Sequence, residues 1–310
     1  MGRPDTARMD SGIITPAVRE WAAQVRPGAR VADCTVRPLA GGAVARRVDR
    51  VTLHLTDGHG TLDLVRKEVP AYEIAGLRAA QAVRPQASAV PELVTWGDDW
   101  LITPLAPGSP LAPDGAIPAN LFDTLARLHH RYQGGAGLSP AIPRVTPAWW
   151  RSLCLEWVAP QLSEYAARHR PEIIERARAL VENVADLPAA SVLLDELQPT
   201  LLHGDVHPGN VITDDGRATL IDWGSCRVGP AALDLANLVT ADSPSVVRYA
   251  RTWQQLTGQP LPAGPIDLGY RWAALQIPVQ YLPWTIGHRP PHAAETALDQ
   301  IEQALSQLPA

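Results

Sequence analysis

Residues 201–224 read LLHGDVHPGNVITDDGRATLIDWG, and the spacing of signals in this stretch decides how the whole chain is interpreted. A short apolar segment that begins at Thr200 leads into the polar loop HGDVHPGN, residues 203–210. Two further apolar segments follow, and the turn signal DDGR separates them, which is typical of a β-hairpin. The stretch therefore predicts a strand, a polar loop and a tight hairpin, in that order.

Three polar side chains in this stretch are not explained by the turn: Asp205, Asn210 and Asp222. A hairpin with a short turn brings its two ends together, so we expect Asn210 and Asp222 to be neighbours, with Asp205 on the loop that leads to them. Carboxylate and amide oxygens without cysteine or paired histidine suit a hard cation, Mg²⁺ in particular. Because Mg²⁺ usually takes one or two protein oxygens and completes its shell with water and phosphate, the pattern indicates a nucleotide site.

Asp205 then remains as a group that accepts a proton from a hydroxyl attacking the γ-phosphate. Such a base typically contributes ~10²–10⁴ in rate. Any one of these three residues alone fits an ordinary turn or strand end. All three at this spacing, each next to an apolar strand, favour a functional site.

The motif HGDVHPGN followed by LIDWG resembles the aminoglycoside phosphotransferase and choline kinase-like family, whose members are relatives of the protein kinases. The resemblance is most specific over residues 203–223. It implies that Asp205 is the catalytic base and that Asn210 and Asp222 bind the metal ion. It also implies that His203 orients the loop and that Asp234 braces it, although Asp234 equally fits an ordinary position at a helix N-terminus.

The rest of the chain fits the fold that this resemblance implies, an α+β, two-lobed protein-kinase-like fold. Apolar periodicity predicts helices over 16–26 and 71–84, with strands before and after the second helix. From residue 118 the pattern is mainly helical, with one β-rich island at 199–222. We therefore expect three parts: a small β-rich, nucleotide-binding lobe with an N-terminal helix over 1–105, a hinge or linker rich in Pro and Gly over 106–117, and a larger helical lobe with the catalytic loop and substrate site over 118–310.

Lys67, in the stretch LVRKEV, is the only lysine of the chain, and the other cationic side chains among its 27 Lys and Arg residues are arginine. In a kinase-like small lobe the third strand carries a lysine that contacts the α- and β-phosphates, and a glutamate on the next helix pairs with it. The resemblance implies these roles for Lys67 and Glu73. An ammonium is a compact point charge that a guanidinium does not duplicate, which is a physical reason for one lysine to persist. The alternative is an exposed strand residue, the usual environment of lysine.

Two further features of the first lobe fit a nucleotide site. Gly41 and Gly42 lie between strands and would place backbone N–H groups over phosphates, although a plain hairpin turn is the more common role of such a pair. The segment WLITPL, residues 100–105, resembles a hinge. In that interpretation adenine bonds to the carbonyl of Thr103 and to the N–H of Leu105.

The acceptor site is expected in the helical lobe, beside the catalytic loop. Most of the ten tryptophans are expected in the core, and aromatic faces combined with carboxylates suit a cationic or amino-bearing ligand. The candidates for contact with the acceptor are Trp149, Trp150 and Trp284.

Composition restricts the partners and the compartment. The formal net charge of −5 argues against a nucleic-acid partner, which usually requires a basic domain. No apolar run approaches the length of a membrane span, and the first residues contain no apolar segment typical of a secretory signal. The three cysteines are widely spaced and fit a reducing compartment. We therefore expect a cytoplasmic protein without a membrane or nucleic-acid partner.

These observations predict a kinase that uses ATP, or another nucleoside triphosphate, and Mg²⁺ to phosphorylate a hydroxyl of a small-molecule acceptor. The resemblance favours an antibiotic-type, aminoglycoside-like acceptor, and hence a role in resistance. A metabolic acceptor such as choline, homoserine or a sugar is the alternative. A third interpretation is a kinase fold that binds nucleotide without catalysis, and the joint presence of Lys67, Asp205, Asn210 and Asp222 argues against it. The pattern leaves the acceptor's identity, the choice of nucleotide and the oligomeric state open.

Overall fold

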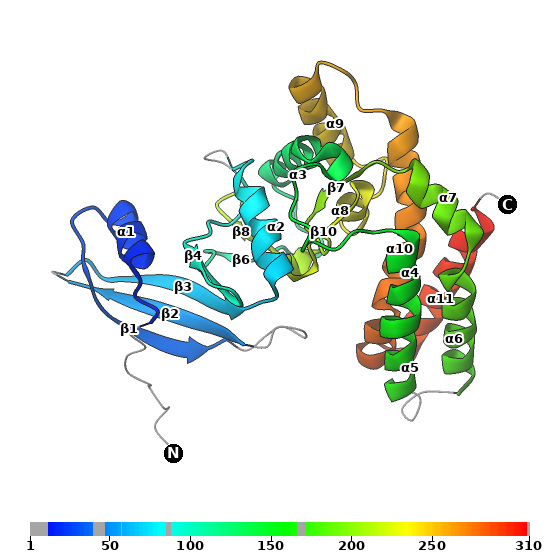
Figure 1. Ribbon diagram of the computed structural model, residues 1–310, viewed down its shortest axis with the longest axis horizontal. Coiled ribbons are helices and arrows are strands. Elements are labelled where there is room, and N and C mark those ends of the chain that lie inside the picture. Colours follow the sequence, from blue (N-terminus) through cyan, green and yellow to red (C-terminus); the bar gives the residue numbers. More distant parts are fainter. Residues whose placement is uncertain (1–11, 40–46, 57, 85–87, 166–170, 309–310) are drawn as a thin grey trace. The chain divides into compact units, whose positions relative to one another are not determined.

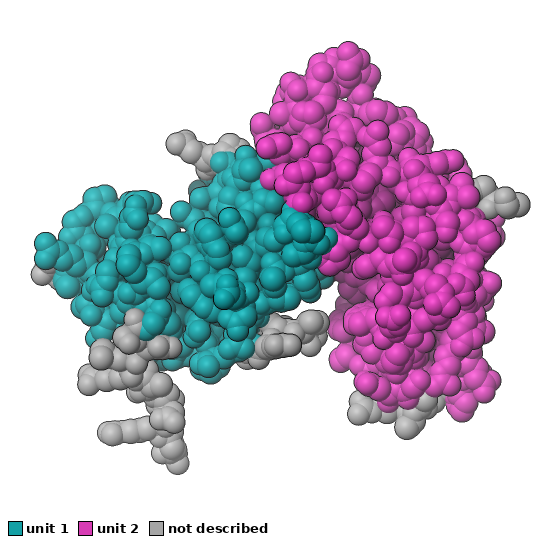
Figure 2. Space-filling view, viewed as in Figure 1, with its two compact units in different colours: residues 1–124, 139–142, 208–226 teal, residues 125–138, 143–207, 227–310 magenta. Residues whose placement is uncertain are grey.

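A computed structural model of the protein describes residues 12–39, 47–56, 58–84, 88–165 and 171–308. The chain forms two compact units, which Figure 2 colours separately. Unit 1 comprises residues 1–124, 139–142 and 208–226, and unit 2 comprises residues 125–138, 143–207 and 227–310. The lobe boundaries expected at 105 and 118 remain a prediction, and the predicted hairpin region belongs to unit 1 by its contacts.

The larger sheet of unit 1 is antiparallel, with the strand order β1-β2-β3-β5-β4. Figure 1 shows β1, β2 and β3 side by side. Helix α1 (Pro16–Val25) begins after Thr15, whose hydroxyl accepts a hydrogen bond from the N–H of Val18. Its buried face, as the periodicity predicts, packs with side chains of this sheet in one apolar cluster. The strands are β1 (Val31–Pro38), β2 (Val48–Leu55), β3 (Thr61–Glu68), β4 (Thr95–Trp96) and β5 (Trp100–Pro104).

Helix α2 (Ala71–Gln81) follows β3 directly, because Pro70 cannot continue the strand ladder and takes the N-cap position. Its buried residues include Ile74, Leu77 and Ala80, the stripe that the sequence predicts. Glu73 is buried in the first turn of the same helix. The first turn of α2 therefore presents a carboxylate within unit 1.

The second sheet of unit 1 contains β6 (Ser109–Pro110), β8 (Val211–Asp214) and β9 (Arg217–Leu220). The β8–β9 hairpin turns through Asp215 and Gly216, which both have positive φ, 45° and 71°. Two such residues form the type I′ turn whose twist matches a hairpin, so the predicted turn is confirmed. The expected linker contains one short strand, β6, which pairs with β8.

Unit 2 is mainly helical and has a two-stranded antiparallel sheet, β7 (Pro199–Leu202) with β10 (Arg227–Pro230). Helix α3 (Ala119–Arg131) begins in unit 1 and continues into unit 2. The further helices of unit 2 are α4 (Pro147–Ser152), the π-helix η2 (Leu153–Val158), α5 (Ala159–Tyr165), α6 (Pro171–Ala185), α7 (Pro188–Glu196), α8 (Ala232–Ala236), α9 (Pro244–Thr257), α10 (Ala263–His288) and α11 (Pro291–Ser306). The helical region predicted after residue 118 contains the π-helix η2, and β10 lies outside the β-rich island predicted at 199–222. The sequence RVGP of β10 carries turn-forming Gly and Pro, which obscure so short a strand.

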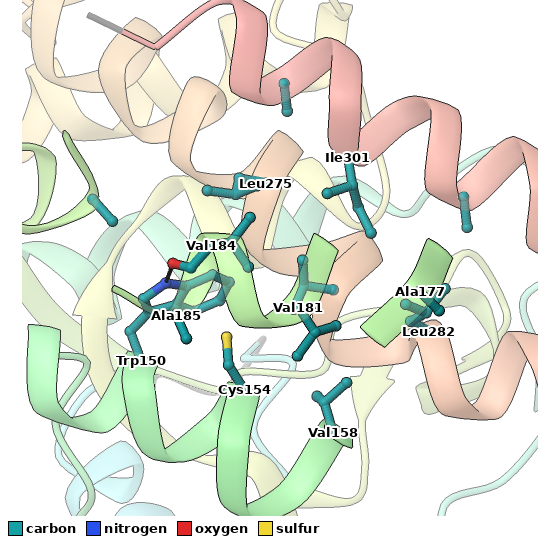
Figure 3. Close-up of a cluster of buried hydrophobic side chains, with 14 of the residues drawn as sticks. Trp150, Cys154, Val158, Ala177, Val181, Val184, Ala185, Leu275, Leu282 and Ile301 are labelled. Carbon is teal, nitrogen blue, oxygen red and sulfur yellow. Dashed lines mark hydrogen bonds between the residues drawn. The ribbon is translucent and has the colours of Figure 1, made fainter. Parts of the chain in front are cut away.

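The core of unit 2 is formed by side chains from its longer helices (Figure 3). Trp150, which with Trp272 is the largest residue of this core, is 1% exposed. Its indole Nε1–H donates a 2.7 Å hydrogen bond to the carbonyl of Val184 on α6, and its ring meets Trp272 of α10 edge-on at 5.0 Å. In the part of the chain that the structure describes, no helix combines the length and apolar character that crossing a bilayer requires.

Candidate active site

Lys67, at the end of β3, lies between two carboxylates of unit 1. Its Nζ is 2.7 Å from Oε1 of Glu73 on α2 and 2.5 Å from Oδ1 of Asp222. The Lys67–Glu73 pair that the sequence predicts is therefore present, since β3 and the first turn of α2 are joined by only two residues. Asp222 is brought to the same ammonium from a position 155 residues further along the chain.

Burial and charge act in opposite directions on this lysine. The side chains of Lys67 and Glu73 are 13% and 3% exposed, whereas that of Asp222 is 44% exposed. Burial lowers the pKa of Lys67, but the adjacent charges of Glu73 and Asp222 outweigh it, so the pKa lies above its ordinary value. The ammonium is thus a fixed positive charge that is paired with a buried carboxylate, Glu73, and with a solvent-accessible one, Asp222.

The β8–β9 hairpin places Asn210 beside Asp222, as the sequence predicts. The N–H of Ile221 donates a 2.9 Å hydrogen bond to the carbonyl of Asn210, so the two ends of the hairpin are directly joined. Asp222 has a left-handed backbone conformation, with φ 61° and ψ 72°, which is uncommon for a residue other than glycine. Such conformations persist where the surroundings impose them, frequently at functional sites.

The two backbone groups predicted to bind adenine at the hinge both face β3 in the structure. The N–H of Leu105 donates a 3.0 Å hydrogen bond to the carbonyl of Asp63. In the same β3–β5 ladder Thr103 pairs with Val65 and lies two positions before Leu105. Backbone groups two residues apart in a strand point to the same side, so those of Thr103 also face β3. Both groups expected to bind adenine are therefore used within the sheet. The phosphate loop with Gly41 and Gly42 lies outside the described residues.

In unit 2, Asp234 of α8 supports the HGDVHPGN loop, residues 203–210, from the interior; this loop is the predicted catalytic loop. Its fully buried carboxylate accepts hydrogen bonds from the backbone N–H groups of His203 and Gly204, both at 2.8 Å. Nε2 of His129 on α3 lies 3.3 Å from the same carboxylate. Nδ1 of His203 accepts from the N–H of Asp205 at 3.3 Å, so this histidine orients the loop, as expected.

The carboxylate of Asp205 contacts a side chain that the sequence did not single out as its partner. The hydroxyl of Tyr281, on α10, donates a hydrogen bond to Oδ1 of Asp205. Nε2 of His207 lies 3.7 Å from Oδ2. Tyr281 was one of several aromatics in the helical region, and no local pattern connects it with a loop 76 residues away.

Arg227 of β10 is a second residue of the loop's surroundings that sequence reasoning missed. It is 7% exposed, and its guanidinium donates to the carbonyl of Gly204 at 2.9 Å and to Oε1 of Gln280 at 3.1 Å. The same group lies over the ring of Trp149 at 5.4 Å. An arginine inside an apolar strand was the available signal, since a buried guanidinium requires several partners.

The three tryptophans expected to contact the acceptor have different environments. Trp150 is a core residue, so that prediction is wrong: adjacent helical residues point apart, and this one faces the interior. Trp149 is partly buried and already carries the guanidinium of Arg227 on its ring. Trp284 is 42% exposed, with Arg289 over its ring at 4.7 Å and His288 stacked at 5.9 Å.

Residues 35–268, which contain Lys67, Asp205 and Asp222, match the sequence model of the phosphotransferase enzyme family. The chain belongs to this family. None of the curated proteins matches this phosphotransferase. The match extends over most of the chain and includes parts of both units.

Solved structures of kinases resemble this phosphotransferase in fold. Choline kinase from Cryptosporidium parvum Iowa II has a TM-score of 0.57 at 12% identity, over 88% of this chain and 89% of that one. A putative fructosamine-3-kinase from Thermobifida fusca has a TM-score of 0.50 at 24% identity, over 93% and 98%. A macrolide 2′-phosphotransferase from Brachybacterium faecium, as apoenzyme, has a TM-score of 0.46 at 19% identity, over 92% and 96%.

The phosphotransferase therefore has the α+β, two-lobed protein-kinase-like fold that the motif predicts. It is an enzyme that transfers a phosphoryl group to an alcohol group of its acceptor. At these identities the solved structures establish the fold, and the choice of acceptor has to be argued from the side chains of this chain.

Proposed function

We propose that this protein is an ATP- and Mg²⁺-dependent kinase that transfers the γ-phosphate to a hydroxyl of a small molecule. The observation that carries this proposal is the position of Lys67, a fixed cation between a buried and an accessible carboxylate. Lys67 would contact the α- and β-phosphates, and Glu73 would keep its ammonium in place. Asp205 of unit 2 would accept the proton of the attacking hydroxyl.

The donor set of the hairpin fits a magnesium ion that arrives with its nucleotide. Asn210 and Asp222 supply amide and carboxylate oxygens from neighbouring positions, and these are ligands that Mg²⁺ prefers. Within the described residues no group of three or more His, Cys, Asp or Glu side chains forms a complete metal cage. A site with two protein ligands suits an ion whose remaining ligands are phosphate and water. When bound, the ion would neutralise charge on the triphosphate.

Adenine would bind one residue away from the predicted hinge positions. Backbone groups of neighbouring strand residues point to opposite sides, and Thr103 and Leu105 face β3. We therefore propose that the carbonyl of Pro104 and the N–H of Ala106 make the two contacts with adenine. Proline has no N–H, which does not matter at a position that only accepts.

Two acceptor classes follow from different observations. The family resemblance favours an antibiotic-type acceptor, such as an aminoglycoside-like amino sugar, and a role in resistance. The side chains favour a less cationic acceptor, such as a sugar or another metabolic alcohol. Arg227 and Arg289 already lie over the rings of Trp149 and Trp284, and a second cation stacking there would meet like charge.

The test is ADP release by the purified protein with Mg²⁺ and ATP, in the presence of single acceptors. The panel contains amino-sugar, macrolide, nucleoside and peptide antibiotics, and also choline, homoserine and simple sugars. We expect one class to stimulate ADP release and the Asp205→Ala variant to abolish that stimulation. ADP release that is the same in the variant would contradict the proposed function, and preference for cationic over neutral acceptors would contradict the less cationic class.

Replacement of Lys67 by arginine should lower kcat/KM for ATP by about tenfold or more, although the charge is retained. The wider guanidinium does not fit the position between Glu73 and Asp222 that a compact ammonium occupies. Steady-state kinetics with varied ATP measure the effect. The matched control is Arg66→Lys, on the next residue of β3, whose cation lies over the ring of Trp100. Unchanged ATP kinetics in Lys67→Arg would remove the proposed role of Lys67.

A further inference from the structure

The hydroxyl of Tyr281 is hydrogen-bonded to two side chains, one of which is that of Asp205. It donates to Oδ1 of Asp205, and the side chain of Asn237, which follows α8, also hydrogen-bonds it. Burial, the charge of Asp205 and their hydrogen bond raise the pKa of Tyr281 above its ordinary value. The phenol therefore stays protonated at neutral pH and serves as a donor.

The elements that carry these groups are themselves fixed within unit 2. Asp205 is on the loop whose backbone N–H groups are bound by Asp234. Tyr281 follows Gln280 on α10, and Gln280 accepts a hydrogen bond from Arg227, which also binds the carbonyl of Gly204. Both ends of the Tyr281–Asp205 contact are thus tied to the same catalytic loop.

We propose that Tyr281 is a positioning residue for the phosphoryl transfer, which holds Oδ1 and so fixes the orientation of the Asp205 carboxylate toward the acceptor hydroxyl. This inference rests on the proposed function of Asp205 as the base. A carboxylate rotates about its Cβ–Cγ bond unless one oxygen is held, and terminal torsions of this kind have broad energy wells. Holding Oδ1 with a neutral donor restricts that rotation and keeps the negative charge of the base.

The proposal predicts a specific pattern of kinetic effects. Tyr281→Phe removes only the hydroxyl, so kcat should fall about tenfold, the range expected when a hydrogen bond to a charged group is lost in the transition state. KM for ATP should stay unchanged, because the phenol contacts the base and not the nucleotide in this assignment. Steady-state kinetics with the best acceptor of the panel, or with water as acceptor if none is found, measure both values.

Tyr270→Phe is the matched control, since it deletes a phenol hydroxyl from the same helix. Tyr270 is partly buried like Tyr281 and donates a 3.2 Å hydrogen bond to the carbonyl of Val239. It lies eleven residues before Tyr281 on the same helix, and its hydroxyl is directed to the segment after α8. We expect similar melting temperatures for the two variants, with a fall in kcat for Tyr281→Phe alone. Equal kcat in both variants would overturn the proposal.

A double-mutant cycle with Asp205→Asn separates this inference from the proposed function. If Tyr281 acts through the carboxylate, adding Tyr281→Phe to Asp205→Asn should cause no further loss of kcat. An additional tenfold loss would show an independent role and would overturn the positioning role. Full turnover in Asp205→Asn alone would instead overturn the base assignment, and the proposed function would fail before Tyr281 is tested.

Discussion

Replacement of Asp205 by asparagine or alanine should lower kcat at least ~10²-fold and leave ATP affinity nearly unchanged. The reason is that Asp205 is assigned to the acceptor hydroxyl, whereas the groups assigned to nucleotide belong to unit 1. A base is required only in the transition state, so its removal affects kcat and kcat/KM equally. Turnover by coupled ADP assay and ATP binding by calorimetry measure the two quantities.

The control for Asp205 is Asp215→Asn, in the same 24-residue stretch. Asp215 occupies the hairpin turn with φ 45°, a conformation that asparagine also adopts readily. It should retain wild-type turnover, because the turn interpretation gives it no chemistry. If Asp215→Asn lost as much activity as Asp205→Asn, then loss of any carboxylate in residues 201–224 would impair turnover. The specific role of Asp205 would then be withdrawn.

Replacement of Asp234 by alanine should destabilise the protein by about 3–5 kcal/mol and abolish turnover. The substitution leaves two backbone N–H groups of the catalytic loop and the ring of His129 buried without their acceptor. Urea unfolding at pH 7 measures the free energy. Asp234→Asn keeps the shape and one acceptor oxygen, so it provides a milder variant if alanine prevents folding. Asp242→Ala, which removes an exposed carboxylate, is the control and should cost less than about 0.5 kcal/mol.

The contribution of Asp234 should also depend on pH in one direction. Burial raises the pKa of this carboxyl, but the hydrogen bonds and charge of His129 and the N–H of Gly204 outweigh burial and lower it. A lowered pKa in the folded state means that the stabilisation is fully present above the unfolded-state value of about 3.9 and is lost as pH falls below it. The difference between wild type and Asp234→Asn should therefore shrink in acid. A difference that grows as pH falls would reverse the assigned direction.

Local chemistry explains why much of the site could be predicted. The hairpin follows from an Asp-Gly pair with positive φ, and it places Asn210 beside Asp222 without help from the rest of the fold. The Lys67–Glu73 pair joins a strand end to the first turn of the next helix, six residues apart. Contacts between residues this close together in the chain can be predicted from a single sequence.

The errors arose where the contacting residue is distant in the sequence, or where the side of a strand or helix that faces its neighbour has to be known. The backbone groups of β5 that face β3 could not be predicted, because alternation alone does not tell which side of the strand faces its neighbour. Trp149 and Trp150 are adjacent on a helix, and only the packing against α6 and α10 decides which of them is buried. Tyr281 reaches Asp205 across 76 residues, a tertiary contact that no local periodicity encodes.

Unit 1 is built from three separate segments of the chain, and this determines when it is completed during folding. The five-stranded sheet uses only residues before 124, so it is available early in synthesis from the N-terminus. The pairing of β6 with β8 has to close a loop across 104 residues, a contact of high sequence separation that forms late. Asn210 and Asp222 therefore join Lys67 only after helices α4 to α7 have been synthesised. A nascent chain that ends before β8 contains the Lys67–Glu73 pair without Asp222, so the proposed nucleotide site is completed only late in folding.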